Sequence, residues 1–181
     1  MTQTKKHAAL IIASSQAPIN LNESNTPLPI FQKVFSMSTF KKEYTTLADA
    51  IITYAIVTPA TKIEDKQPPS FYYYTENAAW DTGAQFSFIS PRIVEALGLN
   101  PYRKAGIMGI GGDQVTDTYL VNIGLSNGKL VSDLEVYCSD LDDYDLLIGM
   151  DIINQTDFLI TNANNKTTFQ FRTPPEGGIE L

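Results

Sequence analysis

Short apolar segments alternate with polar, Pro-rich or Gly-rich turns along most of the chain, a pattern typical of a protein built mainly from short β-strands. β-Branched and aromatic residues dominate these segments. An Asn-Gly pair, Asn127-Gly128, separates two of them and indicates a hairpin. The pattern predicts strands at residues 48–57, 71–74, 78–80, 86–89, 119–125, 130–137, 146–148, 158–160 and 167–171.

Two short helices are expected among these strands. Ser90 is placed to cap the first, Pro91 suits its first position, and Gly98 follows Leu97, its last periodic residue. A second helix is expected within residues 151–155. Many short strands with few helices predict a mostly β domain of closed-barrel type, with one or two short helices.

The chain of 181 residues has the length of one domain. Residues 1–45 are more polar and contain several prolines, so we interpret them as an N-terminal arm or a propeptide, with an ordered part of an interface as the alternative. The domain itself is expected at residues 46–173, followed by a C-terminal tail at residues 174–181.

Charge and hydropathy exclude several classes of partner. The net charge of −7 argues against nucleic acid and against an anionic membrane surface. No apolar run approaches the ~18 residues that span a bilayer. A cytoplasmic protein is the favoured interpretation, and the short apolar run that follows Lys5 and Lys6 keeps secretion as an alternative.

The rare residue types limit the available chemistry. Cys138 is the single cysteine and His7 the single histidine, which excludes an intrachain disulfide, a Cys-based zinc site and a multi-histidine metal site. No metal and no cofactor are expected. Enzymatic chemistry would therefore come from carboxylates, hydroxyls, Lys, Tyr or backbone groups. We interpret Cys138, at the end of an apolar strand, as a buried and inert thiol.

Three motifs occur in a fixed order. Asp81-Thr82-Gly83-Ala84 follows an apolar strand, residues 106–112 form a Gly-rich turn between strands, and Leu147-Ile148-Gly149 lies late in the chain. With this order, residues 48–172 resemble the retropepsin-like aspartic proteases, the family of retroviral proteases and their bacterial relatives. The resemblance implies a closed barrel with one lobe per chain.

The resemblance also implies an activity, that of an aspartic endopeptidase. Asp81, Thr82 and Gly83 would form the catalytic loop, and a second chain of a homodimer would supply the second Asp81. Two carboxylates about 3 Å apart share one proton, so the pair can activate a water molecule between them. Thr82 would hydrogen-bond to its counterpart across the two-fold axis.

The expected substrate is a peptide or protein segment in extended conformation, covered by residues 107–112 as a flap. Leu147 and Gly149 are expected to support the loop from behind. The residues expected to contact substrate are Ala84, Ile107, Met108, Gly109, Ile110, Gly111, Gly112 and Ile148.

Two departures from the family pattern bear on activity. Trp80 stands where the family usually has a smaller aliphatic residue, and Met150 stands where retroviral members commonly have Arg. A catalytically weak retropepsin-fold domain that binds or scaffolds peptides is therefore the alternative function. The acidic residues Asp140, Asp142, Asp143 and Asp145 are interpreted as a solvated turn, because their spacing fails the EF-hand calcium pattern.

Overall fold

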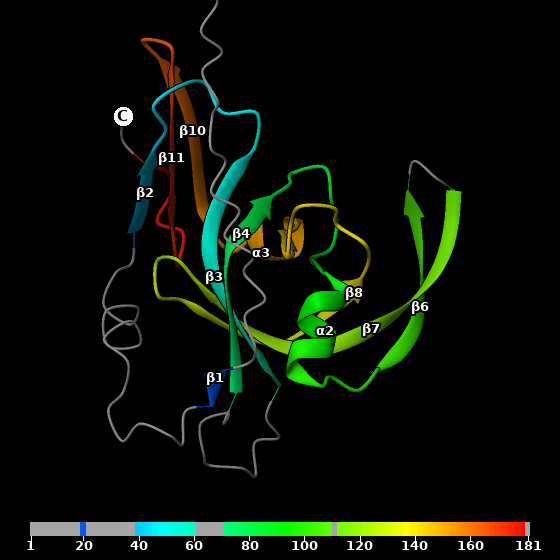
Figure 1. Ribbon diagram of the computed structural model, residues 1–181. Helices are drawn as coiled ribbons and strands as arrows, with labels where there is room; N and C mark the ends of the chain where they lie inside the picture. Colours follow the sequence, from blue (N-terminus) through cyan, green and yellow to red (C-terminus); the bar gives the residue numbers. More distant parts are fainter. Residues whose placement is uncertain (1–18, 21–38, 61–70, 110–111, 180–181) are drawn as a thin grey trace, which may run out of the picture.

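The computed structural model describes residues 19–20, 39–60, 71–109 and 112–179, and most of them lie in β-strands (Figure 1). The elements in chain order are β1 (Ile19–Asn20), β2 (Thr39–Glu43), β3 (Ile51–Pro59), β4 (Phe71–Trp80), β5 (Phe88–Ile89), α2 (Pro91–Leu97), β6 (Arg103–Gly109), β7 (Gly112–Leu125), β8 (Leu130–Cys138), β9 (Leu146–Ile148), α3 (Met150–Ile153), β10 (Asp157–Ala163) and β11 (Lys166–Arg172).

Six strands close into a barrel in the order β4-β3-β7-β8-β5-β9. The barrel closes because β9 pairs in parallel with β4, from Ala78 opposite Leu146 to Trp80 opposite Ile148. The predicted mostly β fold of closed-barrel type, with two short helices among the described residues, is confirmed.

The barrel interior is filled by side chains from alternate strand positions. Val57, Val121, Ile123 and Val136 are fully buried there. Each such side chain contributes about 1.5–3 kcal/mol relative to an exposed one. Helix α2 adds Ile93, also fully buried, to the same core.

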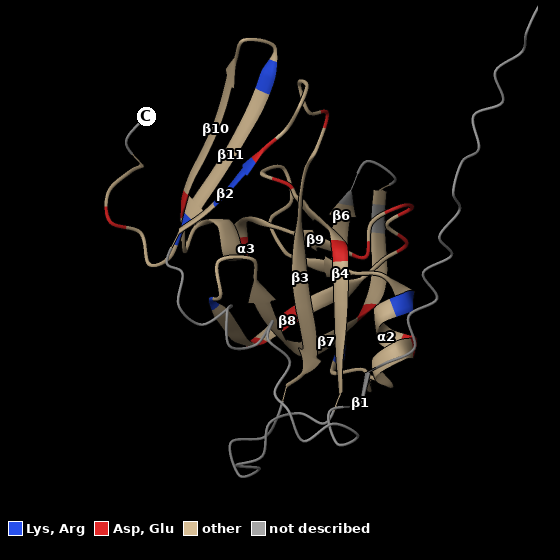
Figure 2. Ribbon diagram, turned by 60° about the vertical axis from the view of Figure 1, so that its left-hand side comes forward, with Lys and Arg blue, Asp and Glu red and all other residues tan. Residues whose placement is uncertain are grey.

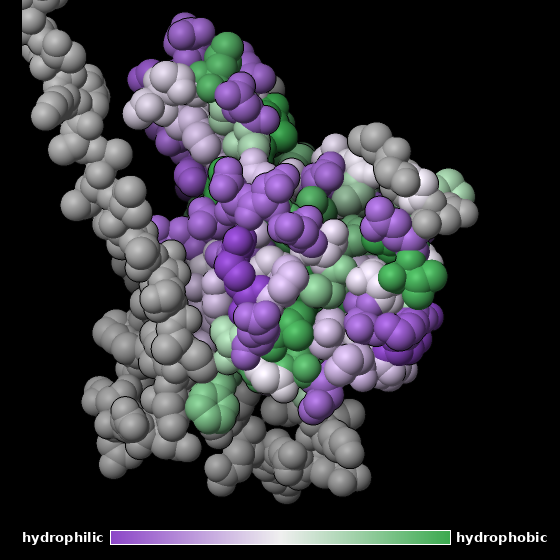
Figure 3. All heavy atoms as spheres, turned by 45° about the vertical axis from the view of Figure 1, so that its right-hand side comes forward, coloured by the Kyte–Doolittle hydropathy of each residue, from purple (hydrophilic) through white to green (hydrophobic). Residues whose placement is uncertain are grey.

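A second sheet of three strands, in the order β10-β11-β2, projects beside the barrel (Figures 1 and 3). Phe40 of β2 pairs with Phe171 of β11, so residues 39–43 of the expected arm form part of a sheet with the C-terminal strands. Ile19 and Asn20 pair with Tyr72 and Phe71 on β4. The remainder of the expected arm, residues 1–18 and 21–38, lies outside the described residues, as does the loop at 61–70.

The first helix begins and ends at the expected residues. Pro91 occupies its first turn, and Gly98 closes it in the left-handed conformation with φ of 58°. Ser90 stands at the N-cap position as expected, but its side chain makes no capping hydrogen bond. The backbone N–H of Ser90 instead donates to the carbonyl of Asp145 at 2.9 Å, and its Oγ is buried without a partner among the described residues.

Asp145 also corrects the prediction of a fully solvated acidic turn. Its side chain is buried, accepts a hydrogen bond from Thr75 Oγ1 at 2.7 Å and forms an ion pair with Arg92 at 2.9 Å. This carboxylate therefore ties helix α2 to β4. Other charged residues are spread along the strands and turns (Figure 2), and several form ion pairs, such as Arg103 with Glu135 and Arg172 with Asp157. The part of the chain that the structure describes contains no helix long and apolar enough to cross a membrane.

Candidate active site

Asp81 directly follows the last residue of β4, where that strand is held on both sides. Trp80 pairs with Ile51 of β3 and with Ile148 of β9. The backbone N–H of Asp81 donates to the carbonyl of Ile148 at 2.9 Å. Because β4 is paired on both sides at its end, the backbone of Asp81 is held in a fixed position.

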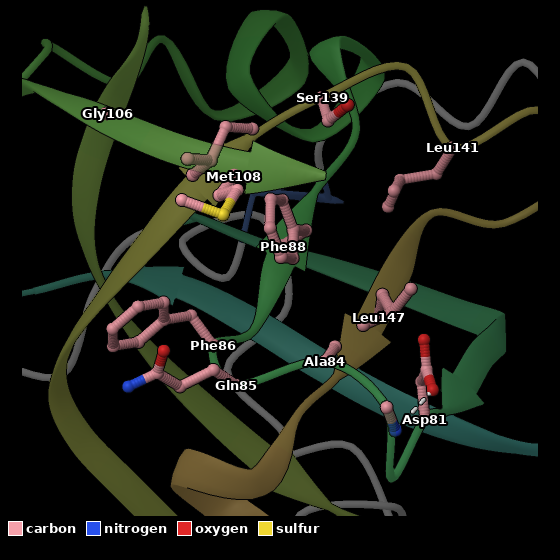
Figure 4. A pocket seen from close by; sticks show the side chains of 12 residues that line it. Asp81, Ala84, Gln85, Phe86, Phe88, Gly106, Met108, Ser139, Leu141 and Leu147 are labelled. Carbon is pink, nitrogen blue, oxygen red and sulfur yellow. Dashed lines mark hydrogen bonds between the residues drawn. The ribbon is translucent and has the colours of Figure 1, made fainter. Parts of the chain in front are cut away.

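The turn after Asp81 bends back onto the carboxylate. The Gly83 N–H donates to Asp81 Oδ1 at 2.8 Å, and the Ala84 N–H donates to the Asp81 carbonyl at 3.3 Å (Figure 4). A Cβ atom on Gly83 would lie 3.1 Å from the same Oδ1, so glycine gives the turn its close approach to the carboxylate. Thr82 is exposed next to this turn.

A cleft of about 940 Å³ opens beside the turn. Asp81 lies at one end and Phe86 at the other, with Leu147 and Phe88 between them (Figure 4). Asp81 contributes the one ionisable side chain of the lining, and most other lining groups are apolar. The cleft can therefore hold an apolar, uncharged molecule against a carboxylate.

The hairpin of β6 and β7 forms another wall of this cleft. Gly106 pairs with Val115, and the register continues to Gly109 opposite Gly112. Ile107 and Met108 line the cleft, although the Met108 side chain remains 87% exposed in the single chain. Ile110 and Gly111, at the expected flap tip, lie outside the described residues.

A hydrogen-bond network connects the floor of the cleft to the start of α3. The Ser87 N–H and Oγ–H donate to the two Asp151 carboxylate oxygens at 2.8 and 2.7 Å, and the Gly149 N–H donates to Ser87 Oγ at 3.0 Å. Two backbone bonds run in parallel, from Met150 N–H to the Ala84 carbonyl and from Asp151 N–H to the Gln85 carbonyl. Five hydrogen bonds with residues 149–151 therefore hold residues 84–87 in place.

The expected roles of Leu147 and Ile148 are reversed. Ile148 was expected to face substrate, but it is fully buried in the barrel core. Leu147 was expected to give support, but it lines the cleft. Neighbouring strand residues point to opposite faces, so an error of one residue exchanges their roles.

Several cleft residues escaped the sequence-based prediction. Residues 84, 86 and 88 alternate, and this period of two was the signal that could have indicated Phe86 and Phe88. Both rings pack on Tyr137 of β8, with centroids 5.0 and 5.5 Å away. Ser139 and Leu141, from the segment after β8, also line the cleft, and no local sequence pattern predicts this role.

The thiol beside this region has no sign of activation. Cys138 is half-buried, and burial raises the pKa of its thiol, an effect that the nearby Asp117 charge reinforces. A raised pKa keeps the sulfur protonated and a poor nucleophile. Among the described residues, no cluster of three or more His, Cys, Asp or Glu side chains is placed to hold a metal ion.

The closed barrel, with its Asp-Thr-Gly turn at the end of β4, is the arrangement that the resemblance to retropepsin-like aspartic proteases implies. Residues 75–152 match the family model described as aspartyl protease. This segment contains all three motifs, so the expected resemblance to retropepsin-like aspartic proteases is confirmed.

The fold is also similar to solved structures at low sequence identity. A retropepsin-like aspartic protease from Rickettsia conorii is 13% identical with a TM-score of 0.44, over 77% of this chain and 97% of that chain. The EIAV protease in complex with the inhibitor HBY-793 is 21% identical with a TM-score of 0.42, over 61% and 90%. The retroviral protease-like domain of Ddi1 from Leishmania major is 16% identical with a TM-score of 0.36, over 71% and 98%. No curated protein matches the chain.

Proposed function

We propose that the protein is an aspartic endopeptidase that hydrolyses peptide bonds as a homodimer. The observation that carries the proposal is the Asp81 carboxylate, which accepts a hydrogen bond from the Gly83 N–H at 2.8 Å and borders a cleft of about 940 Å³ with several apolar side chains in its lining. The family match over residues 75–152 supports the same chemistry.

The reaction needs two carboxylates, and the chain contains a single Asp-Thr-Gly sequence. The second carboxylate therefore comes from Asp81 of a second copy, with the two-fold axis beside the exposed Thr82. Because the pair shares one proton, one carboxylate takes a proton from water and the other donates a hydrogen bond to the peptide carbonyl oxygen. The water oxygen attacks the carbonyl carbon, and the protonated carboxyl transfers its proton to the carbonyl oxygen, which gives a gem-diol. The C–N bond then breaks as the carboxyl that took the proton from water gives it to the amine nitrogen, and the other carboxylate takes a proton from a diol hydroxyl, so that a free acid and a free amine leave.

The three-stranded sheet offers a surface for the second copy. One side of β10 pairs with β11, and its other side has no partner strand within the described residues. An unpaired edge strand is a template for pairing with another chain. Ile160, on this strand, has 42% of its surface exposed.

The substrate is proposed to be an extended peptide with apolar side chains near the scissile bond. Phe86, Phe88 and Leu147 form an apolar floor, with Ile107 and Met108 on the opposing hairpin. Gly109, Ile110, Gly111 and Gly112 are proposed to close over the peptide, and Ala84 to contact its backbone. No metal or cofactor takes part in this proposal.

The test compares the wild type with Asp81→Asn on an unbiased peptide pool between about pH 3 and pH 8, with new termini identified by mass spectrometry. Cleavage by the wild type alone supports an aspartic endopeptidase. Cleavage by neither, from a folded dimer, contradicts the proposal and favours a peptide-binding domain. A chain that starts near Thr39, and so keeps β2, then tests whether the preceding segment acts as a propeptide.

A further inference from the structure

Trp80 lies immediately before Asp81 and is almost fully buried, with 8% of its surface exposed. It does not line the cleft. Its backbone pairs with β3 and β9, and the next peptide group donates from Asp81 to Ile148. A displacement of Trp80 is therefore transmitted directly to the backbone of Asp81.

The indole is fixed by one hydrogen bond inside the barrel. Its Nε1–H donates to Thr53 Oγ1 at 3.0 Å, and Thr53 is 2% exposed. A buried N–H without an acceptor is unfavourable, because it has lost its hydrogen bond to water. The bond to Thr53 therefore favours one orientation of the indole over its alternatives.

The rest of the indole packs against the three-stranded sheet. Its ring centroid lies 4.7 Å from Phe171, 5.2 Å from Phe169 and 5.7 Å from Phe158. These rings come from β10 and β11, which share no hydrogen-bonded ladder with the barrel in the described part of the chain (Figure 1). Aromatic pairs of this kind contribute about 0.5–1.5 kcal/mol each beyond their burial.

The geometry points to Trp80 as a positioning residue, through which the sheet of β2, β10 and β11 sets the location of the Asp81 carboxylate. This inference rests on the proposed function and adds a positioning residue to it. No residue of this sheet lines the cleft, yet its docking against Trp80 decides where Asp81 lies. Misplacement of a catalytic group by about 1 Å costs up to about a hundredfold in rate.

Two phenylalanines of the same sheet provide a matched pair of variants. Phe158, half-buried on β10, contacts the Trp80 ring. Phe40, half-buried on β2, contacts Tyr54 of β3 at 5.8 Å together with Phe169 and Phe171. Phe158→Leu and Phe40→Leu remove the same atoms from the same sheet, but only the first removes a contact with Trp80.

The experiment measures kcat and KM of the full-length wild type and both variants on one cleaved peptide. The temperature is one at which all remain folded, and the protein concentration is one at which sedimentation shows all three to be dimers, because Phe158 lies on the strand proposed to meet the second copy. Phe158→Leu is expected to lower kcat about tenfold, which equals about 1.4 kcal/mol, with KM unchanged. Phe40→Leu is expected to keep kcat within about twofold, although it also lowers the unfolding midpoint. Trp80 is the single tryptophan, so its fluorescence reports ring displacement directly and should shift in Phe158→Leu.

Thr53→Val provides a second variant if Phe158→Leu does not fold. It keeps the buried shape, removes the acceptor for the indole N–H, and is expected to lower kcat at constant KM. Equal losses of kcat in the two Phe variants, or an unchanged kcat where the Trp80 fluorescence has shifted, would overturn the inference alone. Absence of cleavage by the wild type contradicts the proposed function, and the inference then falls with it.

Discussion

Gly149 leaves almost no room for a side chain. A Cβ atom there would lie 2.4 Å from the Phe86 carbonyl oxygen and 2.5 Å from its carbonyl carbon, so backbone atoms would have to move. Gly149→Ala is therefore expected to lower the free energy of unfolding by about 1–3 kcal/mol, as overpacking does, and to reduce cleavage by displacing the cleft floor. Urea unfolding and the peptide assay measure the two effects.

Gly124→Ala is the control for that change. Its nearest contact, with Ile56 Cβ, would be 3.6 Å, which is ordinary van der Waals distance. This strand residue should accept the methyl group with a much smaller loss. An equal loss of stability in both variants would show that the close approach of Gly149 to Phe86 does not cause the loss at Gly149.

Asp151 holds Ser87 through both carboxylate oxygens. Asp151→Asn replaces one acceptor with an NH2 group that faces an N–H or O–H donor. We expect a loss of about 1–3 kcal/mol in the free energy of unfolding by urea, together with lower cleavage. Asp133→Asn, at an exposed position, should change stability by less than about 0.5 kcal/mol. A stable Asp151→Asn protein would mean that the backbone bonds of α3 hold the cleft floor unaided.

At the scale of elements, local sequence patterns predicted most strands and turns. Contacts between segments that are distant in the sequence could not be predicted from such patterns. Hydrophobic alternation and turn residues indicated most strands, the hairpin at Asn127-Gly128 and the C-terminus of α2. Ser90 is the N-cap as predicted, but its Oγ is buried without a hydrogen-bond partner among the described residues, which the sequence did not indicate. The Ile148 prediction failed because the motif located the strand but not which face of it reached the cleft.

The end of β11 and the start of β10 hold the C-terminal segment through one carboxylate. Asp157 accepts the Glu176 N–H at 2.8 Å and the Gly178 N–H at 3.1 Å, and it forms an ion pair with Arg172 at 2.6 Å. The Glu176 N–H, followed by the Arg172 guanidinium, lowers the pKa of Asp157 below its ordinary value of 3.8. The carboxylate form is therefore favoured by folding.

Because the pKa of Asp157 is lower in the folded state than in the unfolded state, its ionised carboxylate stabilises the folded protein. The contribution of Asp157 to stability is complete above the ordinary pKa and is lost as the pH falls through the lower folded value. The unfolding midpoint of the wild type should exceed that of Asp157→Asn at pH 6, and the gap should narrow below about pH 4. Thermal unfolding followed by circular dichroism measures both curves. A gap that stays constant down to pH 2 would contradict this assignment.

The whole molecule combines a barrel that carries Asp81 with a separate sheet that docks beside it. The family motifs indicated the barrel side of this arrangement, because Asp81, the hairpin and Gly149 lie in segments with recognisable spacing. The aromatic docking surface of Trp80, Phe158, Phe169 and Phe171 was not predicted. In the sequence these residues read as ordinary strand positions, and only the folded chain brings them together.

Assembly of two copies is the prediction that belongs to this scale. If the second carboxylate comes from another chain, specific activity should fall on dilution as dimers dissociate, and sedimentation should show the mass decrease over the same concentrations. Ile160→Lys places a charge on the free edge strand β10 and should raise the concentration of half-maximal activity at least about tenfold, because like charges repel across a two-fold interface. Leu130→Lys is the matched control, since Leu130 is 44% exposed against 42% for Ile160 but lies on the barrel strand β8. If the protein is a monomer whose specific activity stays constant on dilution, the shared active site is excluded. If Ile160→Lys and Leu130→Lys have equal effects, the dimer interface does not involve β10.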